Sequence, residues 1–99
     1  MNAWKTDITE FQARRIGKTL EELGELSAVL ARITIQGLDA IDPSSGKTNR
    51  QRMSDETADV IAQIGCNMDA FAMPIEEIDT RAAMKEAQME EWEQLLREK

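Results

Sequence analysis

An acidic segment near the middle of the first half of the chain reads Lys18-Thr19-Leu20-Glu21-Glu22-Leu23-Gly24-Glu25-Leu26. At about 100° of rotation per helical residue, Glu22 and Glu25 lie one turn apart on one side of a helix. The apolar residues Leu26, Val29 and Ile33 continue the same side. The segment therefore predicts a helix with two carboxylates that face the interior of the protein.

A second acidic segment follows, and it reads Asp55-Glu56-Thr57-Ala58-Asp59-Val60-Ile61. Glu56 and Asp59 share a helical face with Val60. Four converging carboxylates repel one another and are costly to remove from water, so they are protonated, splay into solvent, or are joined by a cation. Of these alternatives, a bound cation best explains why two helices each carry an acidic pair. Carboxylate oxygens are ligands that suit Mg²⁺ or Mn²⁺. We therefore expect phosphoryl or nucleotidyl transfer chemistry.

The composition favours a single all-α domain. The 99 residues include only two prolines and five glycines, and tyrosine is absent. A chain this short buries only roughly 60–65% of its unfolded surface, so burial against a partner subunit would add to its stability. The net charge of −7 argues against a surface that coats nucleic acid. With no histidine and only Cys66, we expect neither a zinc site nor an intrachain disulfide.

Targeting features are not evident in the sequence. No charged and then apolar leader opens the chain, and no apolar run approaches the ~20 residues needed to cross a bilayer. We therefore expect a cytoplasmic protein with no membrane contact.

The first helix is expected to run to about Gln36, with Thr6, Asp7 or Thr9 as its cap. Its apolar residues cover two arcs. One arc holds Leu26, Val29 and Ile33, and the other holds Ile16, Leu20, Leu23 and Leu30. A helix with two apolar arcs has two neighbours.

A loop is expected from Gly37 to Met53, because Asp42-Pro43-Ser44-Ser45-Gly46 is typical of a turn. The loop carries Lys47, Arg50 and Arg52, so it is either a solvated charged loop or a mobile basic flap over a polyphosphate. Ser54 is expected to cap a second helix that runs to about Phe71 or Ala72.

A third helix is expected from Ile75 to about Arg97, with Pro74 at its start. Lys85 falls in the middle of its apolar stripe and Arg81 lies at one edge. A cation among core positions needs an anion, so both are candidates to bind a phosphate. The alternative for Lys85 is an ion pair with one of the buried ligand carboxylates.

The paired motif Glu21-Glu22-Leu23-Gly24-Glu25 and Glu56-Thr57-Ala58-Asp59 resembles the EExxE…ExxD signature of the MazG-like all-α nucleoside triphosphate pyrophosphohydrolases, including their short phage and bacterial forms. The resemblance covers roughly residues 15–70. The interval between the two halves is slightly longer than usual in the family, because of the expected Gly37–Met53 loop.

The resemblance implies four metal ligands, Glu22, Glu25, Glu56 and Asp59, with Glu21 as a residue that orients water. It implies hydrolysis of a nucleoside triphosphate, with a purine deoxynucleotide such as dGTP or dATP preferred, to the monophosphate and pyrophosphate. The cofactor would be Mg²⁺ or Mn²⁺.

The remaining candidate substrate contacts lie near the acidic residues. Asn67 and Gln63 share the acidic face of the second helix and would contact a sugar or base, unless they are simply hydrated. Trp4 and Phe11 offer a stacking surface for a base, although core packing explains Phe11 as well.

Two classes of function remain open at this point, the enzyme and a non-catalytic acidic helical interaction module. A di-iron carboxylate bundle uses histidine ligands, which this chain does not have. For either class we expect an antiparallel helical hairpin plus a third helix, with a four-helix-bundle-like core completed in a homodimer or homotetramer.

Overall fold

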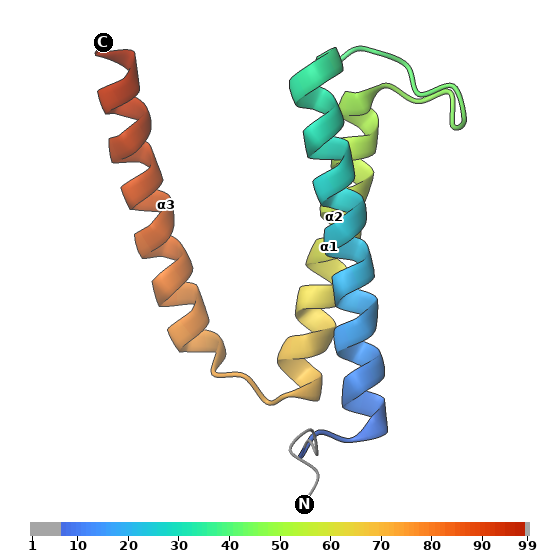
Figure 1. Ribbon diagram of the computed structural model, residues 1–99. Coiled ribbons are helices and arrows are strands. Elements are labelled where there is room, and N and C mark those ends of the chain that lie inside the picture. The colour runs from blue at the N-terminus through green and yellow to red at the C-terminus, as the bar shows by residue number, and fades with distance from the viewer. Residues whose placement is uncertain (1–6, 99) are drawn as a thin grey trace, which may run out of the picture.

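The computed structural model describes residues 7–98, and over this range the chain is helical. It forms α1 (Glu10–Gln36), α2 (Asn49–Ala70) and α3 (Ile75–Arg97), with one isolated bridge between Ile41 and Thr48. α1 and α2 lie side by side and antiparallel, whereas α3 stands apart from them (Figure 1). The expectation of an all-α fold with a helical hairpin and a third helix is confirmed.

Both helices of the hairpin begin with the same Thr-x-x-Gln capping box. At α1, the Gln12 N–H donates to Thr9 Oγ1 and the Thr9 N–H donates to Gln12 Oε1, both at 3.0 Å. At α2, Thr48 and Gln51 make the same exchange at 3.1 and 2.9 Å. Each box satisfies backbone N–H groups that the first turn of a helix leaves without partners.

The start of the second helix was therefore predicted wrongly. Ser54 is not its cap, and the loop does not extend from Gly37 to Met53, because residues 49–53 form the first turn of α2. The connection is residues 37–48. Of the basic residues assigned to it, Lys47 stays in the connection, while Arg50 and Arg52 belong to α2.

The connection is tied to the ends of both helices by hydrogen bonds. Gly37 leaves α1 with a positive φ of 84°, a conformation that glycine adopts without strain. The fully buried Asn49 side chain donates to the Gly37 carbonyl at 3.0 Å and to Gln36 Oε1 at 3.3 Å. Asn49 thus fixes the start of α2 against the end of α1.

The small core lies along the seam between α1 and α2. Val29 is fully buried and Val60 is 8% exposed, and Leu26 and Ile33 are half-buried. The arc of α1 predicted to hold Leu26, Val29 and Ile33 therefore faces α2. The residues of the second arc are 37–63% exposed, namely Ile16, Leu20, Leu23 and Leu30. Within residues 7–98, the expected second neighbour of α1 is not present.

α3 begins directly after Pro74 and ends at Arg97, as the sequence predicts. None of its residues is buried, and its apolar stripe, which includes Met89 and Trp92, is about half exposed. In the part of the chain that the structure describes, no helix has both the length and the apolar character to span a membrane.

Candidate metal centre

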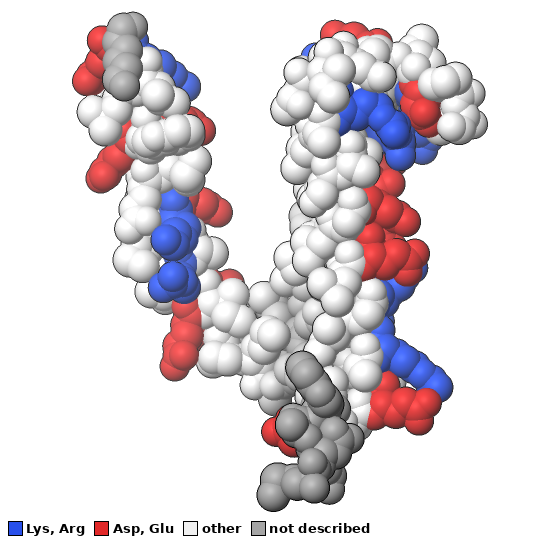
Figure 2. Space-filling model, in the orientation of Figure 1, with Lys and Arg blue, Asp and Glu red and all other residues white. Residues whose placement is uncertain are grey.

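Four carboxylates from α1 and α2 meet at one edge of the hairpin. Glu22, Glu25, Glu56 and Asp59 each offer one oxygen atom that lies within 4.8 Å of the others. Figure 2 shows acidic side chains gathered along this edge of the hairpin, with basic side chains on both sides of them. The convergence expected from the two spacings, Glu22 to Glu25 and Glu56 to Asp59, is therefore present.

The acidic cluster, Glu22, Glu25, Glu56 and Asp59, has a buried floor and an open mouth. Glu22 is buried and Glu56 is half-buried, whereas Glu25 and Asp59 are exposed. One oxygen each of Glu22 and Glu56, the Oε2 atoms, is buried without a hydrogen-bond donor. A buried carboxylate oxygen without a donor is costly, and a divalent cation is one ligand that would satisfy both. The donor set thus fits Mg²⁺ or Mn²⁺.

The neighbouring carboxylates of the cluster change the pKa of Glu25. Repulsion from the Glu22 carboxylate, with smaller effects from desolvation and from Glu56, raises the pKa of Glu25 above its ordinary value of 4.5. Lys18 relieves part of this charge, because its Nζ lies 3.3 Å from Glu22 and 3.4 Å from Glu21. Hydrogen bonds to Glu22 and Glu21 raise the pKa of Lys18. Lys18 and Glu22 are four residues apart, the spacing at which oppositely charged side chains pair along a helix.

Basic residues also flank the cluster on the side of the connection. Arg32 and Arg52 both approach Asp42, and Lys47 Nζ lies 2.7 Å from Asp55. The pKa of Lys47 is raised, mainly by its hydrogen bond to Asp55. Arg32 was not among the residues predicted to lie near the acidic cluster. Its position seven residues after Glu25, two turns along the same face, is the signal that would have found it.

Beyond the cluster, toward the start of α1, polar side chains join the two helices. Asn67 donates to Thr19 Oγ1 at 2.8 Å, and Arg15 donates to Gln63 Oε1. Both predicted substrate contacts, Asn67 and Gln63, are therefore engaged in bonds between α1 and α2. Asn67 Oδ1 and Arg15 Nε are buried without partners, so the seam retains hydrogen-bonding capacity.

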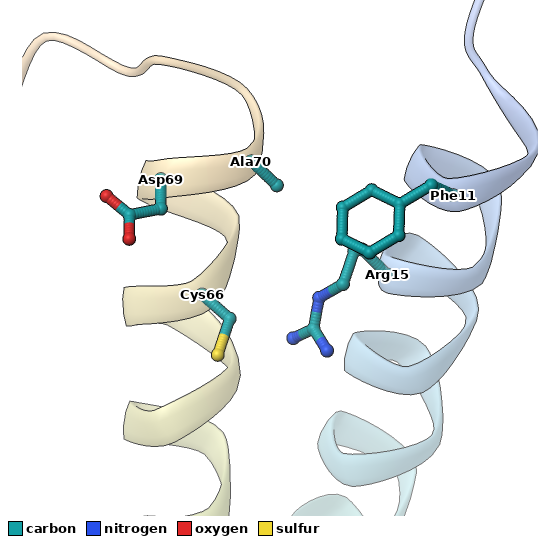
Figure 3. A pocket seen from close by; sticks show the side chains of 5 residues that line it. All are labelled: Phe11, Arg15, Cys66, Asp69 and Ala70. Carbon is teal, nitrogen blue, oxygen red and sulfur yellow. The ribbon is translucent and has the colours of Figure 1, made fainter.

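An open cavity of about 540 Å³ lies at this end of the seam, lined by Phe11, Arg15, Cys66, Asp69 and Ala70. Phe11 and Arg15 point from α1 toward α2, and the Asp69 carboxylate points away from α1 (Figure 3). Arg15 precedes Glu22 by seven residues and Cys66 follows Asp59 by seven. Seven residues make two helical turns, so the cavity lies on the same edge of the hairpin as the acidic cluster, roughly 10 Å away along the helix axis.

The other predicted contacts lie elsewhere. Arg81 and Lys85 are exposed on α3, which stands apart from the hairpin that carries the acidic cluster (Figure 1). The structure of one chain therefore does not bring either of them to the cluster. Trp4 lies outside the described residues.

The fold and the cluster together define a small helical protein with a candidate divalent-cation centre. No protein-family model, curated protein or solved structure was found to match the chain.

Proposed function

We propose that this chain is a metal-dependent nucleoside triphosphate pyrophosphohydrolase of the MazG-like type. The observation that carries the proposal is the acidic cluster, in which two buried carboxylate oxygens have no donor. The carboxylates repel one another, and a cation between them would relieve this repulsion and satisfy the two buried oxygens. The preference for a purine deoxynucleotide comes from the family resemblance.

In the proposed reaction, Glu22, Glu25, Glu56 and Asp59 would hold Mg²⁺ or Mn²⁺. The bound ion would polarise the phosphate oxygens and lower the pKa of a bound water. Glu21, exposed beside Glu22 and sharing Lys18 with it, orients the attacking water and accepts its proton. Water adds to the α-phosphorus, the bond from the α-phosphorus to the bridging oxygen breaks, and the products are the monophosphate and pyrophosphate.

The nucleoside end of the substrate lies toward the cavity at Phe11 and Arg15. The Phe11 side chain is 63% exposed, so its ring is available to stack on a base. The buried Nε of Arg15 and Oδ1 of Asn67 are a donor and an acceptor for a sugar or base. Gln63, bonded to Arg15, holds that guanidinium in place.

A second copy of the chain is proposed to cover the apolar surfaces. The second arc of α1 and the stripe of α3 expose large apolar side chains, which a homodimer or homotetramer with a four-helix-bundle-like core would bury. In such an assembly, Arg81 and Lys85 would act on phosphate across the interface between subunits. Light scattering at micromolar concentration tests this proposal, and a monomer contradicts it.

The proposed activity is tested by incubating the chain with each dNTP and NTP in Mg²⁺ or Mn²⁺ and measuring monophosphate and pyrophosphate. In ¹⁸O-labelled water, attack at the α-phosphorus places the label in the monophosphate, whereas attack at the β-phosphorus places it in the pyrophosphate. Asp59→Asn should abolish turnover, and Glu86→Gln, an equal change of charge on the exposed α3, should not.

The rival function is an acidic helical interaction module, and the exposed stripe of α3 is the observation that favours it. The absence of product with every nucleotide and both metals would support this rival.

A further inference from the structure

Two arginines share a single carboxylate where the connection folds back on the hairpin. Arg32 Nη1 lies 3.7 Å from Asp42 Oδ1, and Arg52 Nη1 lies 3.9 Å from Asp42 Oδ2. These distances are too long for hydrogen bonds. Among residues 7–98, neither guanidinium group donates a hydrogen bond. Each guanidinium carries five N–H donors, so the pair has one surplus positive charge and many unused donors.

Both arginines lie on the edge that carries the acidic cluster. Arg32 follows Glu25 by seven residues on α1, which is roughly 10 Å along the axis, and Arg52 precedes Glu56 by four residues on α2, roughly 6 Å. Figure 2 shows basic side chains directly beside the acidic ones at this end of the hairpin. The edge thus runs from the cavity lined by Phe11 and Arg15, past the acidic cluster, to an end that carries Arg32 and Arg52.

Asp42 does not depend on the arginines to stay in place. Its Oδ2 accepts hydrogen bonds from the Ser45 N–H at 3.1 Å and from the Ser45 hydroxyl at 2.8 Å. The Arg32 and Arg52 side chains are 38% and 23% exposed, so they are partly shielded from water and still accessible. An anion with several oxygens can therefore engage both guanidinium groups while Asp42 remains held by Ser45. Phosphate is such an anion, because its oxygens match the fork of a guanidinium group.

We propose that Arg32 and Arg52 form the binding site for the terminal phosphates of the substrate, which leave as pyrophosphate. This inference rests on the proposed function and deepens it, since it fixes the direction of the substrate along the edge. The triphosphate tail lies toward the connection, the α-phosphate lies at the acidic cluster, and the nucleoside lies toward Phe11 and Arg15. Arg52 is nearer the acids and contacts the β-phosphate, and Arg32 contacts the γ-phosphate.

The test uses Arg32→Gln and Arg52→Gln, with Arg50→Gln as the matched control. Arg50 lies on the same turn of α2 as Arg52, but it pairs with the exposed Asp39 at 3.2 Å. Inorganic pyrophosphate with Mn²⁺ and a nucleoside monophosphate serve as two separate probes, and calorimetry measures the binding of each. Each of the two test variants should weaken pyrophosphate binding by about tenfold or more, the usual effect of losing a charge-assisted hydrogen bond. Monophosphate binding should change by less than about twofold, because the arginines do not reach that end.

Steady-state kinetics provide a second measurement. Arg32→Gln should reduce the preference of the enzyme for a triphosphate over a diphosphate, since the lost contact is to the γ-phosphate. Wild-type binding of pyrophosphate by both test variants would overturn the inference, and so would an equal loss of monophosphate affinity. If the wild-type chain hydrolyses no nucleotide, the proposed function fails, while the calorimetric comparison still decides whether the arginines bind pyrophosphate.

Discussion

Replacing Glu22 by methionine should make the metal-free protein more stable and remove its response to metal. Glu22 is only 8% exposed, and its Oε2 has no donor. A buried polar group without a partner costs about 1–3 kcal/mol, and methionine of similar length removes that cost. The lost contact with the half-exposed Lys18 offsets only a small part of the gain, because exposed ion pairs contribute little. The net increase in the free energy of unfolding should be about 1–2 kcal/mol.

The assay is thermal unfolding, first with a chelator and then with Mn²⁺. For a domain of this size, 1–2 kcal/mol raises Tm by roughly 4–16 °C, so Glu22→Met should unfold later than the wild type in chelator. At Mn²⁺ about 100-fold above its Kd, the wild type should gain about 2.7 kcal/mol and the variant almost nothing. The order of the two Tm values should therefore reverse. Glu21→Met, an adjacent exposed change, should alter stability by less than about 0.5 kcal/mol and keep the Mn²⁺ response.

Two results would refute this reasoning. If Glu22→Met unfolds earlier than the wild type in chelator, the Glu22 carboxylate stabilises the fold by itself. If the variant gains as much from Mn²⁺ as the wild type does, Glu22 is not a ligand.

The remaining predictions concern other residues of the acidic cluster and of the connection between α1 and α2. Asp59→Asn should reduce pyrophosphate release by more than about 100-fold with unchanged circular dichroism, because it removes a proposed ligand at the open mouth of the cluster. The pKa of Glu25 is raised above 4.5, so the folded metal-free chain binds a proton more tightly than the unfolded chain does. The free energy of unfolding of the metal-free chain should therefore fall as pH rises from 4.5 through the raised pKa of Glu25. The affinity for Mn²⁺ should increase over the same pH range. In thermal melts and metal titrations, Glu25→Gln should lose both trends. The hydrogen bond from Ser45 lowers the pKa of Asp42 below 3.8. The contribution of Asp42 to stability is therefore lost only at a pH below the range in which Glu25 titrates. Asn49→Ala should lower the unfolding free energy by about 1–3 kcal/mol in urea titrations, because it removes the buried donors to Gly37 and Gln36, and it should preserve a metal-induced rise in Tm.

Much of the helical structure could be predicted from local chemistry. Pro74 fixes the start of α3, and the apolar arc with Val29 identifies the face of α1 that meets α2. The predicted start of α2 at Ser54 is wrong, because Ser54 lies inside the helix that Thr48 caps. The Thr48-x-x-Gln51 pair is an equally local signal, and its reciprocal hydrogen bonds hold the actual start.

The acidic cluster followed from spacing, while its surroundings did not. Helical periodicity places Glu22 with Glu25 and Glu56 with Asp59, and an antiparallel hairpin brings the pairs together. The approach of Arg32 and Arg52 to Asp42 depends on how the connection folds back, which no periodicity encodes. The position of α3, and with it of Lys85, depends on packing, and none of the residues of α3 is buried in this chain.

The hydrogen bonds from the Asn49 side chain to the end of α1 are also useful for protein engineering. Together with the Thr48 cap, they set the alignment of the two helices at the base of the connection, away from the exposed tip residues Pro43 and Ser44. A peptide tag or a fluorescent label inserted at that tip should leave the spacing of the acids intact. The chain therefore offers a permissive insertion point a short distance from its candidate centre.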